Sequence, residues 1–246
     1  LYEYYKQRTN SIFASAEIGW KSMLYLTVTG RNDWDSALAG TPHSSFFYPS
    51  VGLSALISQM VKLPEWVSYL KVRGSYASVG TAIPRNLTSD AHYKFDDATQ
   101  SWVTNEYPPL DELYPERTDS WEAGLSAKFW ENRFSLDVTW YKSNTKKQTM
   151  LVPISASGGY TKQYVQSGDV QNMGMEFALG FNNTWGDFSW SSNLTYSFNK
   201  NKIIALSPQL EGNYIDQGGI GTSRIELHEG GSMGDVYVTT QLKRDQ

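Results

Sequence analysis

Two pairs of adjacent acidic residues, Asp96-Asp97 and Asp111-Glu112, carry the side chains that a glycosidase uses as general acid and base. That chemistry needs two carboxylates held at a fixed separation beside a substrate. Both pairs lie in polar segments in which no pattern fixes such a separation, and paired acids of this kind are usually solvated. A loop-carboxylate hydrolase therefore stays a minor alternative, and we expect the chain not to be an enzyme.

Residues that commonly bind metals are few and scattered. His43, His92 and His228 lie in predicted loops and share no metal-ligand spacing. Residues 31–36, with the sequence RNDWDS, offer three oxygen ligands but lack the rest of a calcium loop, and a turn that closes a strand explains them better. The chain has no cysteine, which excludes disulfides and thiolate ligands. We expect no metal and no cofactor.

Aromatic side chains in the predicted loops offer a different chemistry, because their rings can stack on sugars or hold peptide side chains. The candidates are Trp34, Tyr93, Trp102, Tyr107 and Tyr114. Each ring can equally pack one loop against another, since ordered long loops need internal packing. For any single residue the packing role is favoured, and as a group the five are the substrate-binding candidates.

Composition limits the class of protein that positions these residues. The chain has 246 residues, a formal net charge of -4, 19% charged residues and 14% aromatic residues. This balance predicts no nucleic-acid partner. The longest stretch without Asp, Glu, Lys or Arg, residues 36–61, contains Pro, Gly and many Ser, so no spanning helix is predicted. Residues 1–8 do not resemble a signal peptide, and we expect a piece of a longer protein.

Apolar and polar residues alternate through most of the chain, which predicts an all-β, antiparallel fold. Residues 121–129 and 134–141 form one clear hairpin, and residues 172–181 and 188–198 form another. Earlier segments and residues 236–242 repeat the pattern, giving about nine strands and no convincing amphipathic helix. Charged residues fall on the polar face only, and those predicted to face a barrel lumen are Lys71, Arg73, Glu122, Asp137 and Glu176.

Alternation alone fits both a soluble β-sandwich and an outer-membrane barrel. Three features favour the barrel. Runs such as residues 186–199 exceed the roughly 5–6 residues of a soluble strand. Short links near residues 21, 58–65, 131–132 and 183–186 alternate with long ones at 32–45, 80–116, 143–171 and 201–232. Aromatic residues gather at the short-turn ends, as in membrane-interface girdles: Trp20, Trp66, Phe129, Trp130, Phe134, Trp185, Phe188 and Trp190. A sandwich that binds carbohydrate remains the alternative.

Several segments, in order along nearly the whole chain, resemble the SusC/RagA family of TonB-dependent outer-membrane receptors. They are LYLTVTGRNDWDS (24–36), FFYPSV (46–51), LKVRGSYASVG (70–80), RTDSWEAGL (117–125), NRFSLDVTWY (132–141) and GDVQNMGME (168–176). Each segment alone is an ordinary strand end, and the set together is specific.

The resemblance implies a 22-stranded barrel closed by a plug, in the outer membrane of a Bacteroidetes-type bacterium. Such receptors import oligosaccharides or peptides with a SusD-like lipoprotein as lid and with energy supplied through TonB. We expect residues 1–246 to be an internal part of the barrel wall, without plug, TonB box or signal peptide. The apolar face would contact outer-membrane lipid, the polar face would contact the plug or the solvent path, and residues 81–116 would meet substrate or lid.

Overall fold

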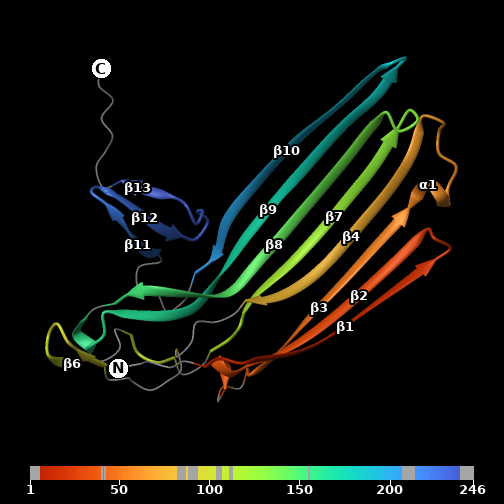
Figure 1. The fold of residues 1–246 in the computed structure, drawn as a ribbon. Helices are drawn as coiled ribbons and strands as arrows, with labels where there is room; N and C mark the ends of the chain where they lie inside the picture. Colours follow the sequence, from red (N-terminus) through yellow and green to blue (C-terminus); the bar gives the residue numbers. More distant parts are fainter. Residues whose placement is uncertain are drawn as a thin grey trace, which may run out of the picture.

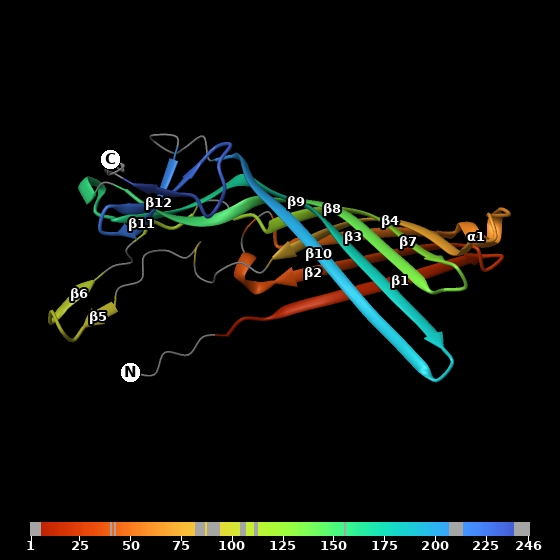
Figure 2. The same cartoon turned by 90° about the horizontal axis from the view of Figure 1, so that it is seen from above.

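The computed structural model describes residues 6–39, 41, 43–81, 87, 94–103, 107–110, 113–154, 156–206 and 214–238. Eight long strands form one antiparallel sheet in which every strand pairs with the next long strand along the chain (Figure 1). The strands are β1 (Thr9–Trp20), β2 (Leu24–Asp35), β3 (Ser45–Leu56), β4 (Val67–Thr81), β7 (Glu116–Phe129), β8 (Phe134–Pro153), β9 (Lys162–Trp185) and β10 (Phe188–Ala205). The sheet is curved, so that β1 and β10 approach the viewer in Figure 2 while the central strands lie behind them. No helix in the described part of the chain is long and apolar enough to cross a membrane.

The strand register keeps the two faces of the sheet chemically distinct. Leu125 of β7 pairs with Val72 of β4 and Val138 of β8, and the same row continues through Phe177 and Tyr196. Side chains on this apolar face are widely exposed, with Leu194 at 65% and Tyr196 at 63%. A sandwich would bury this face under a second sheet, and the two small sheets in the described part of the chain leave it exposed. The sandwich alternative is therefore wrong.

The long sheet has eight strands where about nine were predicted. The predicted strand 236–242 contributes only β13 (Val236–Val238), and residues 239–242 lie outside the described part. β13 belongs to a separate three-stranded sheet with β11 (Tyr214–Ile220) and β12 (Ser223–His228). A four-residue helix, α1 (Ile57–Met60), follows β3 at the position where the predicted strand was expected to end.

The segment 143–171, predicted as a loop, is mostly strand. β8 runs on to Pro153 and β9 starts at Lys162, with the one-turn element η2 (Ala156–Gly158) between them. Lys147, with a φ of 55°, lies opposite Gly168, with a φ of 94°, and the pairing register is the same on both sides of them. Residues 142–149 are all polar, so the sequence shows no alternation there. The extended hairpin is stabilised by a hydrophobic core shared with β10, β11 and β12: Met150, Val152, Val165, Val170, Ile203, Leu206, Ile215 and Leu227.

The connections at the same end contain a second small core. Leu38, Leu87 and Leu113 are each at most 2% exposed and pack together with Phe46 and Tyr107. Leu38 belongs to the one-turn element η1 (Ser36–Leu38). The connection after β4 also carries a short hairpin, β5 (Lys94–Asp96) and β6 (Ser101–Val103). Segments far apart in sequence thus form packed structure beyond the strand ends.

Candidate functional site

An ion network on the polar face joins three strands of the wall. The Arg73 guanidinium of β4 lies 3.1 Å from the Asp137 carboxylate of β8 and 3.5 Å from the Glu122 carboxylate of β7. Arg73 also donates hydrogen bonds to the hydroxyls of Ser126 and Thr139. Buried and half-buried charges are stabilised only when their hydrogen-bonding capacity is used, and here one guanidinium meets four acceptors.

Two other predicted members of the polar face lie beside this network. Lys71 pairs in register with Ser126, and Glu176 pairs with Thr139, so both point to the same side as Arg73 and Asp137. In the part of the chain that the structure describes, neither residue forms an ion pair with another side chain. The strand periodicity in the sequence identified all five residues, but it contained no signal for which of them would pair.

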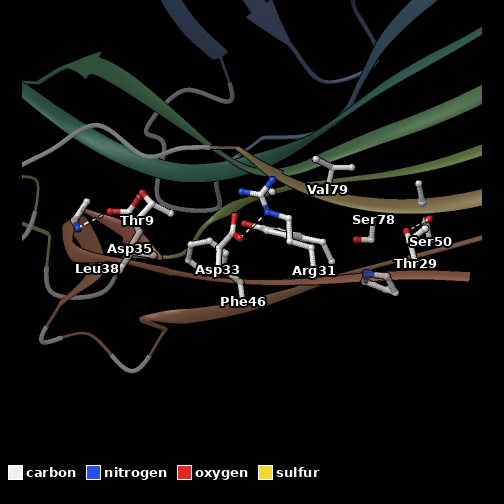
Figure 3. A pocket seen from close by; sticks show the side chains of 15 residues that line it. Thr9, Thr29, Arg31, Asp33, Asp35, Leu38, Phe46, Ser50, Ser78 and Val79 are labelled. Carbon is white, nitrogen blue, oxygen red and sulfur yellow. Dashed lines mark hydrogen bonds and ion pairs between the residues drawn. The ribbon is translucent and has the colours of Figure 1, made fainter. Parts of the chain in front are cut away.

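A hollow of about 610 Å³ lies on the polar side near the outer ends of β1, β2, β3 and β4. Figure 3 shows the Arg31 and Asp33 side chains pointing toward each other inside it, at 2.7 Å. Tyr48 closes one side, and its ring occupies the space that a Cβ on Gly80 would fill. The hollow does not follow from the sequence, which predicts only a turn for residues 31–36, because its walls come from four separate strands.

The oxygen-rich segment 31–36, predicted as a turn, is mostly strand: β2 continues to Asp35, and the chain turns only at η1, which starts at Ser36. The Asp35 carboxylate accepts hydrogen bonds from the Ala37 backbone N–H at 2.8 Å and the Thr9 hydroxyl at 2.8 Å, which caps η1 and fastens β1 to β2. Among the described residues, no group of three or more His, Asp or Glu side chains is placed to hold a metal ion.

The predicted substrate-binding aromatics are placed very differently from one another. Trp102 of β6 is 68% exposed and makes an edge-on contact with Phe95 at 5.4 Å between ring centroids. Tyr107 instead packs edge-on against Tyr164 at 4.7 Å within the second core. Trp34 lies in β2, and its place in the strand puts it on the apolar face, on the side of Leu26 and Val28.

Tyr114 joins its own connection to the one after β2 and to the β8–β9 hairpin. Its ring lies 4.2 Å from the His43 ring and 3.4 Å from the Lys147 ammonium, and the Gln166 side chain bonds both its N–H and its carbonyl. Tyr93 lies outside the described residues. The structure therefore does not bring the four described aromatics together at one place.

The acidic pairs do not form a described catalytic arrangement. The Asp96 carboxylate accepts hydrogen bonds from the Ala98 N–H at 2.9 Å and the Thr99 hydroxyl at 3.0 Å, which are contacts that shape the β5–β6 turn. Asp111 and Glu112 lie outside the described residues.

Aromatic rings form a continuous line across the short-turn ends of the strands, as the sequence predicted. Centroid distances along this line are 5.9 Å for Trp66–Trp130, 5.4 Å for Trp130–Phe134, 4.8 Å for Phe134–Phe181, 6.2 Å for Phe181–Trp185 and 6.1 Å for Trp185–Phe188. These rings stay about half exposed, with Trp130 and Trp185 both at 53%. Amphipathic rings in this position suit a boundary between hydrocarbon and water.

The sequence model of the family described as "TonB dependent receptor-like, beta-barrel" matches residues 1–225. The chain belongs to this family. TonB-dependent receptor P26 of Formosa agariphila is 29% identical over 204 residues, covering 80% of this chain and 20% of that receptor. TonB-dependent receptor SusC of Bacteroides thetaiotaomicron is 26% identical over 164 residues, covering 63% of this chain and 16% of SusC. These relatives confirm the SusC/RagA resemblance and fit a Bacteroidetes source.

The solved structure of the RagAB peptide transporter has the same fold. It superposes with a TM-score of 0.75 at 22% identity, covering 91% of this chain and 25% of that chain. This TonB-dependent receptor chain thus spans between 16% and 25% of the length of these three relatives.

Membership of the TonB-dependent receptor family places the chain in the outer membrane and fixes the orientation of the sheet. The apolar face meets lipid, the short turns and their aromatic line lie on the periplasmic side, and the long connections lie outside the cell. The apolar side chains that the eight-stranded sheet leaves exposed are then covered by the hydrocarbon of the membrane.

Proposed function

We propose that this chain forms part of the wall and outer loops of a receptor that imports oligosaccharides or peptides across the outer membrane. Energy would come through TonB, and a SusD-like lipoprotein would cover the outer opening. The observation that carries the proposal is a two-faced sheet of long strands, with an exposed apolar face on one side and an ion network on the other. The names of the relatives, which include SusC and a peptide transporter, support the import of a nutrient.

We infer that the polar face lines the lumen, with residues 1–246 entirely in the barrel domain. Arg73, Glu122 and Asp137 share that face, where water or a plug can solvate charges that lipid cannot. Lys71 and Glu176 point to the same side without ion-pair partners among the described residues, so they are available to a plug surface. Their role would be to hold the plug in register against β4 and β9.

Trp102 is the strongest substrate-contact candidate among the five aromatics. It is the most exposed ring with a described environment in the outer connections, and it stands on a hairpin that projects from the wall in Figure 2. Tyr107 and Tyr114 support loop packing instead, and the placement of Trp34 favours a lipid or interface contact. Exposed aromatic rings bind sugars and peptide side chains through their faces.

The proposal is tested by deleting the whole receptor gene in its host and measuring growth on defined oligosaccharides and on peptide mixtures as limiting nutrients. We expect growth to fail on one class only and to return with the wild-type gene. Complementation with Trp102→Ala should slow growth at low nutrient concentration, whereas the matched Tyr107→Phe should not. Unchanged growth of the deletion strain on every nutrient would contradict the import function.

A further inference from the structure

The outward face of the wall changes from apolar to basic within two rows of paired residues. One row holds the register partners Trp121, Lys142, Met173 and Lys200, on β7, β8, β9 and β10. Trp140, Met175 and Phe198 form the neighbouring row toward the short turns, and Asn144, Gln171 and Lys202 form the neighbouring row toward the loops. Because alternate residues of a strand share a face, Lys142, Lys200 and Lys202 all stand on the lipid side, at its outer boundary.

These lysines have no carboxylate partner in the described part of the chain, although acidic residues lie close by. Asp119 receives hydrogen bonds from the Ser78 hydroxyl at 2.7 Å and the Lys146 ammonium at 3.4 Å. The Asp169 carboxylate accepts a hydrogen bond from the Asn144 amide at 2.6 Å. Asp119 is thus ion-paired with Arg117 and Lys146, whereas Asp169 keeps its charge. Three lysines beside this one carboxylate leave an excess of positive charge above the apolar band.

The distances between the three lysines suit a ligand with more than one anionic oxygen. Lys142 and Lys200 are separated by two strand spacings, about 10 Å, and Lys200 and Lys202 by two residues along a strand, about 7 Å. Flexible ammonium groups at these distances can converge on one phosphate or on two neighbouring ones. Met173 is 38% exposed between Lys142 and Lys200, and Trp121 in the same row is 57% exposed, so apolar surface for an acyl chain adjoins the charges.

We propose that Lys142, Lys200 and Lys202 form a binding site for the phosphate groups of an acylated glycolipid in the outer leaflet. Phosphorylated glycolipids make up much of that leaflet, so their phosphates meet the wall at the level where its apolar band ends. β8, β9 and β10 lie side by side there (Figure 1), so one lipid can contact all three strands. The proposal rests on the outer-membrane orientation and does not depend on which nutrient is imported.

The test uses the complete receptor, purified in detergent, with diphosphorylated lipid A as the probe and native mass spectrometry as the readout. The triple variant Lys142→Gln, Lys200→Gln, Lys202→Gln is compared with a matched control at the short-turn end, Lys21→Gln, Lys62→Gln, Lys128→Gln. A lysine at an anionic membrane surface contributes roughly a fivefold factor in binding. We expect on the order of a hundredfold weaker binding for the first variant, wild-type binding for the control, and recovery when the three lysines are replaced by arginine.

Three results would overturn the proposal. Equal lipid A binding by both triple variants would show that the lysines are not the site. Equal binding of dephosphorylated lipid A by the wild type would show that apolar contact alone holds the lipid. Displacement of lipid A by millimolar inorganic phosphate would show a site for free anions. Heat-dependent gel migration checks the folding of each variant, and the single Lys200→Gln variant, expected to lose roughly fivefold, decides the matter if the triple variant fails to fold.

Discussion

The Arg73 guanidinium contacts the Asp137 carboxylate across a whole intervening strand. The two groups are 3.1 Å apart, although β7 lies between β4 and β8. The residue of β7 that pairs with Arg73 is Gly124, and a Cβ there would lie 2.6 Å from Arg73 Cζ. Because Gly124 has no side chain, the Arg73 side chain can cross β7 and reach the Asp137 carboxylate.

A larger side chain at position 124 should destabilise the folded sheet. We expect Gly124→Val to displace Arg73 and to lower the free energy of unfolding by about 1.5–3 kcal/mol, the value of a hydrogen bond to a charged group. Gly52→Val on β3 is the control, because its Cβ would meet only the Ser75 Cβ at 3.9 Å. The measurement is urea unfolding of the complete receptor in lipid vesicles. Equal effects of the two variants would contradict a special role for Gly124.

The two faces of β8 should respond oppositely to changes of charge. Leu136→Arg places a cation on the lipid face, which costs about 2–4 kcal/mol at mid-membrane, and should prevent assembly. Asp137→Asn on the opposite face should cost under about 1 kcal/mol, because an amide oxygen at this position can still accept a hydrogen bond from Arg73 and Glu122 still faces Arg73. Surface levels measured with an antibody to residues 81–116 distinguish the two. Equal levels would refute the assigned facing.

The aromatic line at the periplasmic rim should stabilise the barrel through its ring contacts. Trp130→Ala removes contacts to Trp66, Phe129 and Phe134, and we expect a loss of about 1.5–4.5 kcal/mol, since each of the three ring pairs contributes about 0.5–1.5 kcal/mol. Unfolding in vesicles provides the measurement. Trp102→Ala, outside the membrane, is the control and should leave the unfolding free energy unchanged.

The small core beneath the outer connections should hold them together independently of the barrel. Leu38 is fully buried, and Leu38→Ala should cost about 2–5 kcal/mol of local stability, as for other large-to-small core changes. Limited proteolysis of intact cells should then cut the connections faster, while heat-dependent gel migration of the barrel stays normal. Val79→Ala, at a residue 56% exposed, should change neither property. Equal cleavage of the wild type and Leu38→Ala would contradict the role of this core.

The alternation in the sequence determined the hairpins and the two faces, because each strand residue points to the opposite side from its neighbours. It therefore placed Arg73, Glu122 and Asp137 on one side and Leu136 on the other. It also placed the aromatic line, since Trp130 and Trp185 adjoin turns that are short in the sequence itself.

Tertiary structure alone decided which of these residues meet. The Arg73–Asp137 contact depends on strand register and on the space above Gly124, and neither follows from the pattern of a single strand. The same is true of the lysine row, where Lys142 and Lys200 are 58 residues apart in sequence and become neighbours only through their common partner Met173. The extended β8–β9 hairpin could not be predicted because residues 142–149 are polar at every position and show no alternation, and the buried contacts of Met150 and Val165 with the adjoining small sheet stabilise the pairing beyond them.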